Sequence, residues 1–164
     1  MALLDSVDPE GLDEFSVVFT DRSLNHMSAT FQQVMRDLSA WLGEVYGAEA
    51  VAIVPGGGTY AMEAVARQFA RGQDVLVVRN GWFSYRWSQI IENADLTNGA
   101  EVLRARMQGN EAPAPFVPAP IEEVTQAIRE SKPQVVFAPH VEPRSGMTLP
   151  DAYHKAAAAP GGEG

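Results

Sequence analysis

Apolar residues recur at three- and four-residue spacing between residues 24 and 46, the pattern of a helix with one buried stripe. The stripe comprises Met27, Phe31, Val34, Met35, Leu38, Trp41, Leu42 and Val45. Gly47 follows the last of these positions and can end the helix in a left-handed conformation. The spacing therefore predicts a long amphipathic helix over residues 24–46.

Short apolar runs alternate with helical patterns along the rest of the chain. The runs that predict strands lie at residues 50–54, 74–78, 101–103 and 134–138. The patterns that predict helices lie at residues 59–71, 83–93 and 121–131. This alternation predicts an α/β fold, a mainly parallel sheet with flanking helices on both sides.

The remaining segments set the expected domain organisation. Residues 107–120 are rich in Pro and Ala and predict a surface connection, and a last helix is expected to begin near Asp151. The composition of residues 156–164 predicts a disordered tail. With an N-terminal segment at residues 1–23, we expect one α/β domain over residues 24–155, since 164 residues suit a single core.

Composition narrows the classes of function. The formal net charge of -9 and the scattered Lys and Arg argue against a nucleic-acid partner, which needs a concentrated basic surface. The absence of Cys excludes disulfides and thiolate metal sites and fits a cytoplasmic protein. No secretory signal pattern occurs, and no apolar run approaches the roughly 20 residues that span a bilayer. We expect a soluble cytoplasmic protein without a membrane partner.

A glycine turn between a predicted strand and a predicted helix is the most informative segment. Gly57, Gly58 and Thr59 open the helix, where unpaired N–H groups and the helix dipole favour a phosphate. A plain tight turn is about equally compatible with these residues. The segment matches neither a P-loop, which needs Gly-Lys-Ser/Thr, nor a dinucleotide fingerprint.

Two further segments follow predicted strands and should project from the same edge of the sheet. Residues 80–87 carry four aromatic residues, one of which could cover a flat heterocycle while the others pack against the sheet. His140 and Glu142 could be metal ligands or an acid/base pair, although loop-orienting hydrogen bonds are the favoured interpretation. We expect the chain reversals at Gly57, Phe83 and His140 to converge.

Together the three segments resemble the class V aminotransferases of fold type I, the group that contains alanine:glyoxylate and serine:pyruvate aminotransferases. The resemblance covers residues 24–153, and it assigns the phosphate of pyridoxal 5'-phosphate to Gly57, Gly58 and Thr59. A second family motif is matched by Asn80, Gly81, Phe83 and Arg86, which makes Phe83 the ring that stacks on the pyridine. The resemblance therefore implies an incomplete large domain of this fold, cut off before the cofactor-anchoring lysine.

The third family motif is matched only in part. His140, Val141 and Glu142 begin it and Gly146 lies near its end, but Pro143 replaces a hydroxyl residue that the family places near the cofactor ring, with Arg144 beside it. The family's aspartate for the pyridine nitrogen and its Schiff-base lysine are expected beyond residue 164. Neither Lys132 nor Lys155 is expected to replace that lysine.

For the complete enzyme the resemblance implies amino-group transfer from a small amino acid to a 2-oxo acid such as glyoxylate or pyruvate, in a homodimer. We expect this chain to be catalytically silent by itself. A non-catalytic module that binds a phosphorylated metabolite is the alternative. A nucleotide-binding α/β enzyme ranks well behind it, because residues 79–81 offer no acidic side chain for a ribose.

Overall fold

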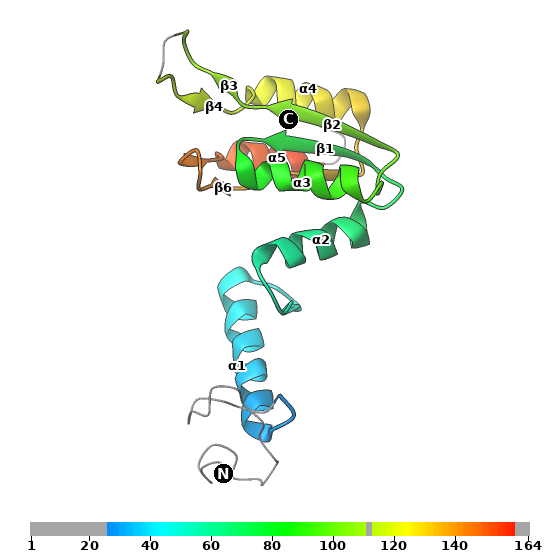
Figure 1. Ribbon diagram of the computed structural model, residues 1–164, viewed down its shortest axis with the longest axis vertical. Helices are drawn as coiled ribbons and strands as arrows, with labels where there is room; N and C mark the ends of the chain where they lie inside the picture. The colour runs from blue at the N-terminus through cyan, green and yellow to red at the C-terminus, as the bar shows by residue number, and fades with distance from the viewer. Residues whose placement is uncertain (1–25, 111–112, 160–164) are drawn as a thin grey trace. The chain divides into compact units, whose positions relative to one another are not determined.

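A computed structural model of the chain describes residues 26–110 and 113–159 (Figure 1). The chain divides after Val54 into two units, Met1–Val54 and Pro55–Gly164. The expected N-terminal segment, residues 1–23, lies outside the described residues, as do residues 160–164 of the expected tail. None of the described helices is long and apolar enough to cross a membrane.

The first unit contains helix α1, Ala29–Tyr46. The helix begins where the Ser28 hydroxyl accepts a hydrogen bond from the Phe31 N–H at 3.1 Å, and it ends at Gly47, whose φ of 59° is left-handed. The predicted helix is therefore confirmed over residues 29–46. Burial of its stripe is not, because no residue of α1 is buried and Trp41 is 62% exposed.

The predicted strand at residues 50–54 is wrong. The segment has no strand conformation, it belongs to no sheet in the described part of the chain, and Ile53 and Val54 are each 39% exposed. A strand exists only where its backbone groups find a hydrogen-bonding partner. An apolar run does not specify a neighbouring strand, so the hydrophobic pattern alone was not sufficient to predict a strand at residues 50–54.

The second unit is built on a three-stranded parallel sheet in the order β2-β1-β5. Its strands are β1, Asp74–Arg79; β2, Gly99–Arg104; and β5, Val135–Phe137. Its helices are α2, Gly58–Phe69; α3, Trp82–Asn93; α4, Ile121–Ser131; and α5, Asp151–Ala158. The predicted α/β class, with a parallel sheet and flanking helices, is confirmed.

The central strand β1 separates two cores. Leu76 and Val78 face the residues of α4 and α5, whereas Val75 and Val77 pack with Ile91 of α3 on the opposite face. Four successive buried residues in β1 therefore reflect a strand that is covered on both sides, as its unbroken apolar run predicts. The packing of both faces of β1 fixes the position of its carboxyl end relative to α3, the helix that follows it.

Short hairpins extend the loops of this unit. The predicted connection at residues 107–120 contains an antiparallel pair, β3 (Arg106–Met107) with β4 (Phe116–Val117), and β6 (Val141–Glu142) pairs with β7 (Met147–Thr148). Residues 156–158, assigned by composition to the tail, are helical in α5. Alanine is the strongest helix former, and Ala157 packs against the core.

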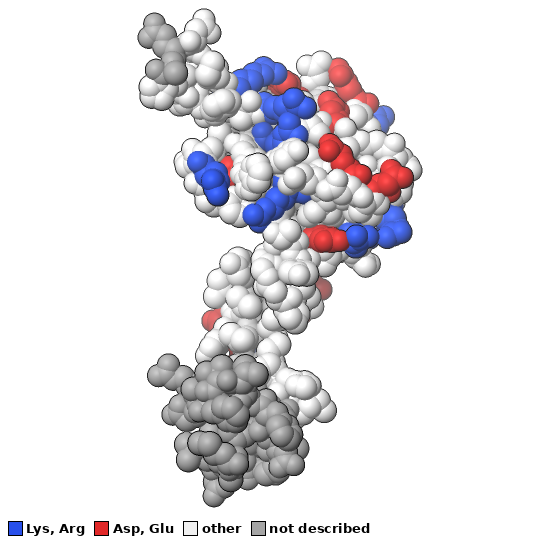
Figure 2. All heavy atoms as spheres, viewed as in Figure 1, with Lys and Arg blue, Asp and Glu red and all other residues white. Residues whose placement is uncertain are grey.

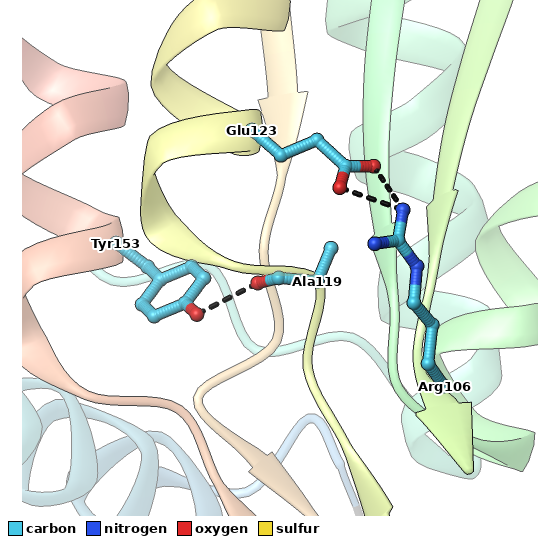
Figure 3. A network of polar contacts seen from close by, with 4 residues as sticks. All are labelled: Arg106, Ala119, Glu123 and Tyr153. Atoms are coloured by element: carbon cyan, nitrogen blue, oxygen red, sulfur yellow. Dashed lines mark hydrogen bonds and ion pairs between the residues drawn. The ribbon is translucent and has the colours of Figure 1, made fainter. Parts of the chain in front are cut away.

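Two polar contacts join α4 and the residue before it to neighbouring elements (Figure 3). The Tyr153 hydroxyl of α5 donates to the buried Ala119 carbonyl, just before α4, at 2.7 Å. Arg106 of β3 donates to both carboxylate oxygens of Glu123 in α4, at 2.7 and 2.6 Å. The two cores place α4 and α5 on the face of the sheet away from α3, and the Tyr153–Ala119 bond holds the two helices together there.

Candidate functional site

The glycine turn leads directly into α2. Gly56 has a φ of 126°, and a Cβ on it would lie 2.6 Å from a ring carbon of Tyr60, so glycine is required there. The N-cap residue Gly57 makes no side-chain cap hydrogen bond, and a Cβ at Gly57 or Gly58 would meet nothing within 4 Å. The backbone at the start of α2 therefore has open space beside it, which leaves room for an anion at the helix start.

Arg86 joins this turn to α3. Its guanidinium donates a hydrogen bond from Nη1 to the Thr59 hydroxyl at 2.8 Å, and its central carbon lies 4.7 Å from the centroid of the Phe83 ring. The Thr59 oxygen accepts from Arg86, so its own proton remains available for an anion. Arg86 thus brings a permanent positive charge to the point where the turn and the aromatic ring meet.

Glu142 caps the start of α3. Its carboxylate accepts hydrogen bonds from the Phe83 N–H at 3.0 Å, the Ser84 N–H at 2.9 Å and the Ser84 hydroxyl at 2.7 Å. The Ser84 oxygen in turn accepts from the N–H groups of Asn80 and Gly81, at 2.8 and 2.9 Å. Its single proton goes to the carboxylate, the charged and closer acceptor, so the first turn of α3 is held by one buried network.

The environment of Glu142 keeps its side chain ionised. Burial, which leaves the residue only 1% exposed, raises the pKa of the carboxyl, but the hydrogen bonds from Ser84, Phe83 and Arg144 outweigh it and lower the pKa below the ordinary 4.5. The positive end of the α3 dipole acts in the same direction. The group is therefore a carboxylate at neutral pH.

Gly81 makes room for that carboxylate. Its φ of 173° is ordinary extended backbone, so strain does not explain the glycine. A Cβ on Gly81 would lie 2.5 Å from Cγ of Glu142 and 2.6 Å from its carboxyl carbon. The Asn-Gly pair after β1 thus has a steric role against the loop that follows β5.

Three successive contacts connect the segments that were expected to converge: Thr59 contacts Arg86, Arg86 contacts the ring of Phe83, and the Phe83 N–H donates to Glu142. His140 takes no part in them. Its exposed ring lies 5.4 Å from that of His154 on α5. The interpretation of Glu142 as a loop-orienting hydrogen-bond acceptor is confirmed, and the described residues hold no group of three or more His, Cys, Asp or Glu suited to a metal ion.

An apolar groove of ≈ 590 Å³ opens beside Phe83. Phe83 and Trp87 line it from α3, Met62 lines it from α2, and Pro139 and Pro143 line it from the segment after β5. Pro143, where the resemblance calls for a hydroxyl, gives this wall an apolar surface. The groove can accommodate a flat apolar ring against Phe83, close to the Thr59–Arg86 contact.

Arginines that are scattered in the sequence gather at the carboxyl edge of the sheet. Arg79 and Arg104 end β1 and β2 and are paired in register. Arg86, Arg106 and Arg144 lie in the elements and turns that follow the strands. Figure 2 shows several basic side chains of this unit on the left, where β1 and β2 end in Figure 1, and others on the right. This edge favours anions although the chain carries a net charge of -9.

The sequence predicted Gly57, Gly58, Thr59 and Phe83 as the binding residues, but it did not predict the hydrogen bonds and packing that hold the start of α3. Ser84, the third residue of α3, and the fit between Gly81 and Glu142 were not anticipated. The available signal was a serine four residues after Asn80, at the position from which a hydroxyl can bond back to the start of a helix.

The fold and these contacts define an α/β unit with an anion-receptive glycine turn beside an aromatic groove. No protein-family model matches the chain, and comparison with curated proteins gives no match. Among solved structures, the chain is similar to ureidoglycine-glyoxylate aminotransferase from Bacillus subtilis, with a TM-score of 0.60 and 21% identity. The likeness covers 79% of this chain and 33% of that one, so this chain spans about a third of its length. The shared feature is the fold of part of an aminotransferase.

Proposed function

We propose that this chain is the cofactor-phosphate portion of a class V, pyridoxal 5'-phosphate-dependent aminotransferase. The observation that carries the proposal is the sequence of contacts from Thr59 through Arg86 to Phe83, which joins a glycine turn, a fixed positive charge and an aromatic ring. The fold likeness to an aminotransferase supports it. The whole protein is proposed to be a cytoplasmic homodimer that transfers an amino group from a small amino acid to glyoxylate or pyruvate.

The residues of the turn fit the phosphate of the cofactor. The N–H groups of Gly58 and Thr59 lie in the first turn of α2, where no side chain caps them, and the Thr59 hydroxyl has a proton to donate. Arg86 supplies the charge, and Phe83 supplies a face for the pyridine ring. When bound, pyridoxal phosphate supplies an electron sink for the bonds at the amino-acid α-carbon.

The chain's only lysines, Lys132 and Lys155, are badly placed to bond the cofactor aldehyde. Lys132 ends α4 just before the amino end of β5, whereas Phe83 follows the carboxyl end of the parallel strand β1. Lys155 is exposed on α5, whose Tyr153 packs on the other face of the sheet. We therefore propose that this chain binds the cofactor and, alone, does not catalyse transamination.

Pyridoxamine 5'-phosphate is the sharpest probe, because it carries the phosphate and the ring but cannot form an adventitious Schiff base with a surface lysine. We expect it to quench the fluorescence of Trp82 and Trp87, which flank Phe83 in α3, and to bind at least tenfold more tightly than pyridoxamine, which corresponds to ~1.4 kcal/mol from the phosphate. Equal affinities for the two compounds would contradict the phosphate assignment.

Gly58→Ala supplies a matched variant. A Cβ at this position meets no protein atom within 4 Å, and alanine is the better helix former, so the variant should fold at least as well as the parent. The added methyl group stands where the phosphate must approach the backbone. Weaker binding of pyridoxamine 5'-phosphate, with unchanged thermal unfolding, is the expected result. Unchanged binding would show that the turn has no part in the site.

Transamination assays test the second half of the proposal. The purified chain should give no product with alanine or serine as amino donor and glyoxylate or pyruvate as acceptor, with added cofactor. Measurable turnover would overturn the proposed inactivity. Tight binding of phosphorylated sugars in place of pyridoxamine 5'-phosphate would favour a non-catalytic module for phosphorylated metabolites.

A further inference from the structure

A buried carboxylate holds together two segments that lie 58 residues apart in the chain. Glu142, in β6, accepts the N–H groups of Phe83 and Ser84 at the start of α3, and both bonds are 3.0 Å or shorter. The side chain is 1% exposed. Each backbone bond fixes the first turn of the helix, and therefore the direction in which the Phe83 side chain leaves it.

Helix stability alone does not account for a charge at this position. Ser84 accepts from the N–H groups of Asn80 and Gly81, which precede the helix, and the N–H groups of Phe83 and Ser84 within it could be capped by a neutral acceptor. Burial of a carboxylate carries a desolvation penalty of several kcal/mol that neutral or apolar side chains avoid. The arrangement also restricts residue 81 to glycine, because a Cβ would lie 2.5 Å from Cγ of Glu142. The Glu142 carboxylate is bonded to the backbone N–H of Phe83, the residue whose ring lines the groove.

We propose that Glu142 is a positioning residue that holds the Phe83 ring against the cofactor groove. This inference rests on the proposed function. Pro143, which follows β6, also lines the groove, so the Glu142 carboxylate joins the helix that carries the ring to a second segment of the groove lining. Arg86 lies in the second turn of α3 and is held separately by Thr59, so the phosphate turn does not depend on the cap.

The test compares two ligands in the full chain. Inorganic phosphate reports on the turn alone, whereas pyridoxamine 5'-phosphate reports on the turn and the ring together. In Glu142→Gln, we expect affinity for pyridoxamine 5'-phosphate to fall about three- to tenfold, the worth of one aromatic stacking contact. Affinity for phosphate should stay within about twofold. Glu92→Gln, at the exposed far end of α3, is the matched control and should change neither affinity.

A double-mutant cycle assigns the effect to Phe83. In a Phe83→Leu background, Glu142→Gln should no longer weaken binding of pyridoxamine 5'-phosphate, because the ring that it positions is absent. Equal losses in both backgrounds would overturn the inference. So would a variant in which both ligands weaken in parallel with the melting temperature, since that pattern indicates a general structural role.

The inference and the proposed function fail in different ways. If the parent chain binds pyridoxamine 5'-phosphate in preference to pyridoxamine but Glu142→Gln binds it equally well, the positioning role is wrong and the site stands. If the parent chain shows no such preference, the proposed function is wrong and the inference falls with it. Should Glu142→Gln fold poorly, Ser84→Ala provides a second variant. It removes the 2.7 Å hydroxyl bond to the carboxylate, together with the bonds that the hydroxyl accepts from Asn80 and Gly81, and keeps both backbone bonds to Glu142. A selective loss for the ring ligand supports the inference and no loss overturns it.

Discussion

The indole of Trp87 is stacked on the ring of Phe137, with the ring centroids 4.3 Å apart and the planes inclined by 21°. The contact joins α3 to β5 within the core that also contains Val75 and Val77. It therefore sets the distance between the helix that presents Phe83 and the strand that leads to Glu142. The pair therefore contributes to the spacing of both elements of the proposed site, together with the other residues of this core.

Removal of that pair should destabilise the second unit. Trp87→Ala is expected to lower the free energy of unfolding by about 2–4 kcal/mol, through lost apolar burial and lost stacking. Trp82→Ala, on the same helix but 51% exposed, should lower it by less than about 1 kcal/mol. Urea unfolding followed by circular dichroism compares the two. Similar losses in both variants would show that the stacked pair is not a structural contact.

A methyl group at residue 81 should act through crowding. Gly81→Ala places a Cβ 2.5 Å from Cγ of Glu142, and relief of that overlap is expected to cost about 1–3 kcal/mol of folding free energy. The Glu142→Ala variant removes the clashing atoms, so Gly81→Ala should cost less in that background. A cost that is the same in both backgrounds would locate its cause elsewhere.

The acid stability of the chain should depend on Glu142. Its folded-state pKa is lowered below 4.5, so its contribution to stability is fully present above pH 4.5 and is lost as the pH falls through the lowered value. The difference in unfolding free energy between the parent and Glu142→Gln should therefore be constant above that range and shrink below it. Urea midpoints measured across acid pH test this. A difference that grows on acidification would contradict the assigned direction.

The Tyr153 hydroxyl should stabilise the junction between α4 and α5. Tyr153→Phe leaves the buried Ala119 carbonyl without its 2.7 Å donor, at an expected cost of about 1–3 kcal/mol. Tyr60→Phe, whose ring is 65% exposed, serves as the control and should be nearly neutral. Thermal and urea unfolding of the two variants provide the comparison, and equal stabilities would contradict a role for the bond.

The stability of the chain at alkaline pH should also depend on Tyr153. Burial, with a smaller effect from the negative charge of Glu122, raises the pKa of Tyr153 above the ordinary 10.0. Its contribution is therefore complete below pH 10.0 and is lost as the pH rises through the raised value. Tyr153→Phe should remove this part of the pH dependence. A parent and a variant that lose stability in parallel at alkaline pH would count against it.

Elements with strong local patterns were predictable from the sequence. Helix α4 occupies the predicted residues 121–131, and β1 includes the whole of the predicted strand at residues 74–78. In both cases a periodic or continuous apolar pattern coincides with burial in a core. The strand prediction at residues 50–54 failed because pairing depends on a partner, which local composition does not encode.

The sequence could predict which loops form the candidate site, but not the side-chain contacts between them. Parallel strands direct successive loops to one edge, so convergence of the segments around Phe83 and residue 140, which follow β1 and β5, could be expected from the sequence. The turn at Gly57 follows no strand, and the sequence pattern alone does not explain its approach to the other two segments. The bonds between Glu142 and Ser84, and between Arg86 and Thr59, join residues 58 and 27 positions apart. Such pairings depend on the packing of whole elements, which no short motif specifies.

The arginines at the carboxyl edge of the sheet give that edge of the second unit a positive electrostatic field. An approaching anion is turned toward the carboxyl edge even though the chain as a whole repels it. Because mobile salt ions screen this long-range field more than they screen close contacts, the association rate constant of a phosphorylated ligand should fall with ionic strength while its dissociation rate constant changes little.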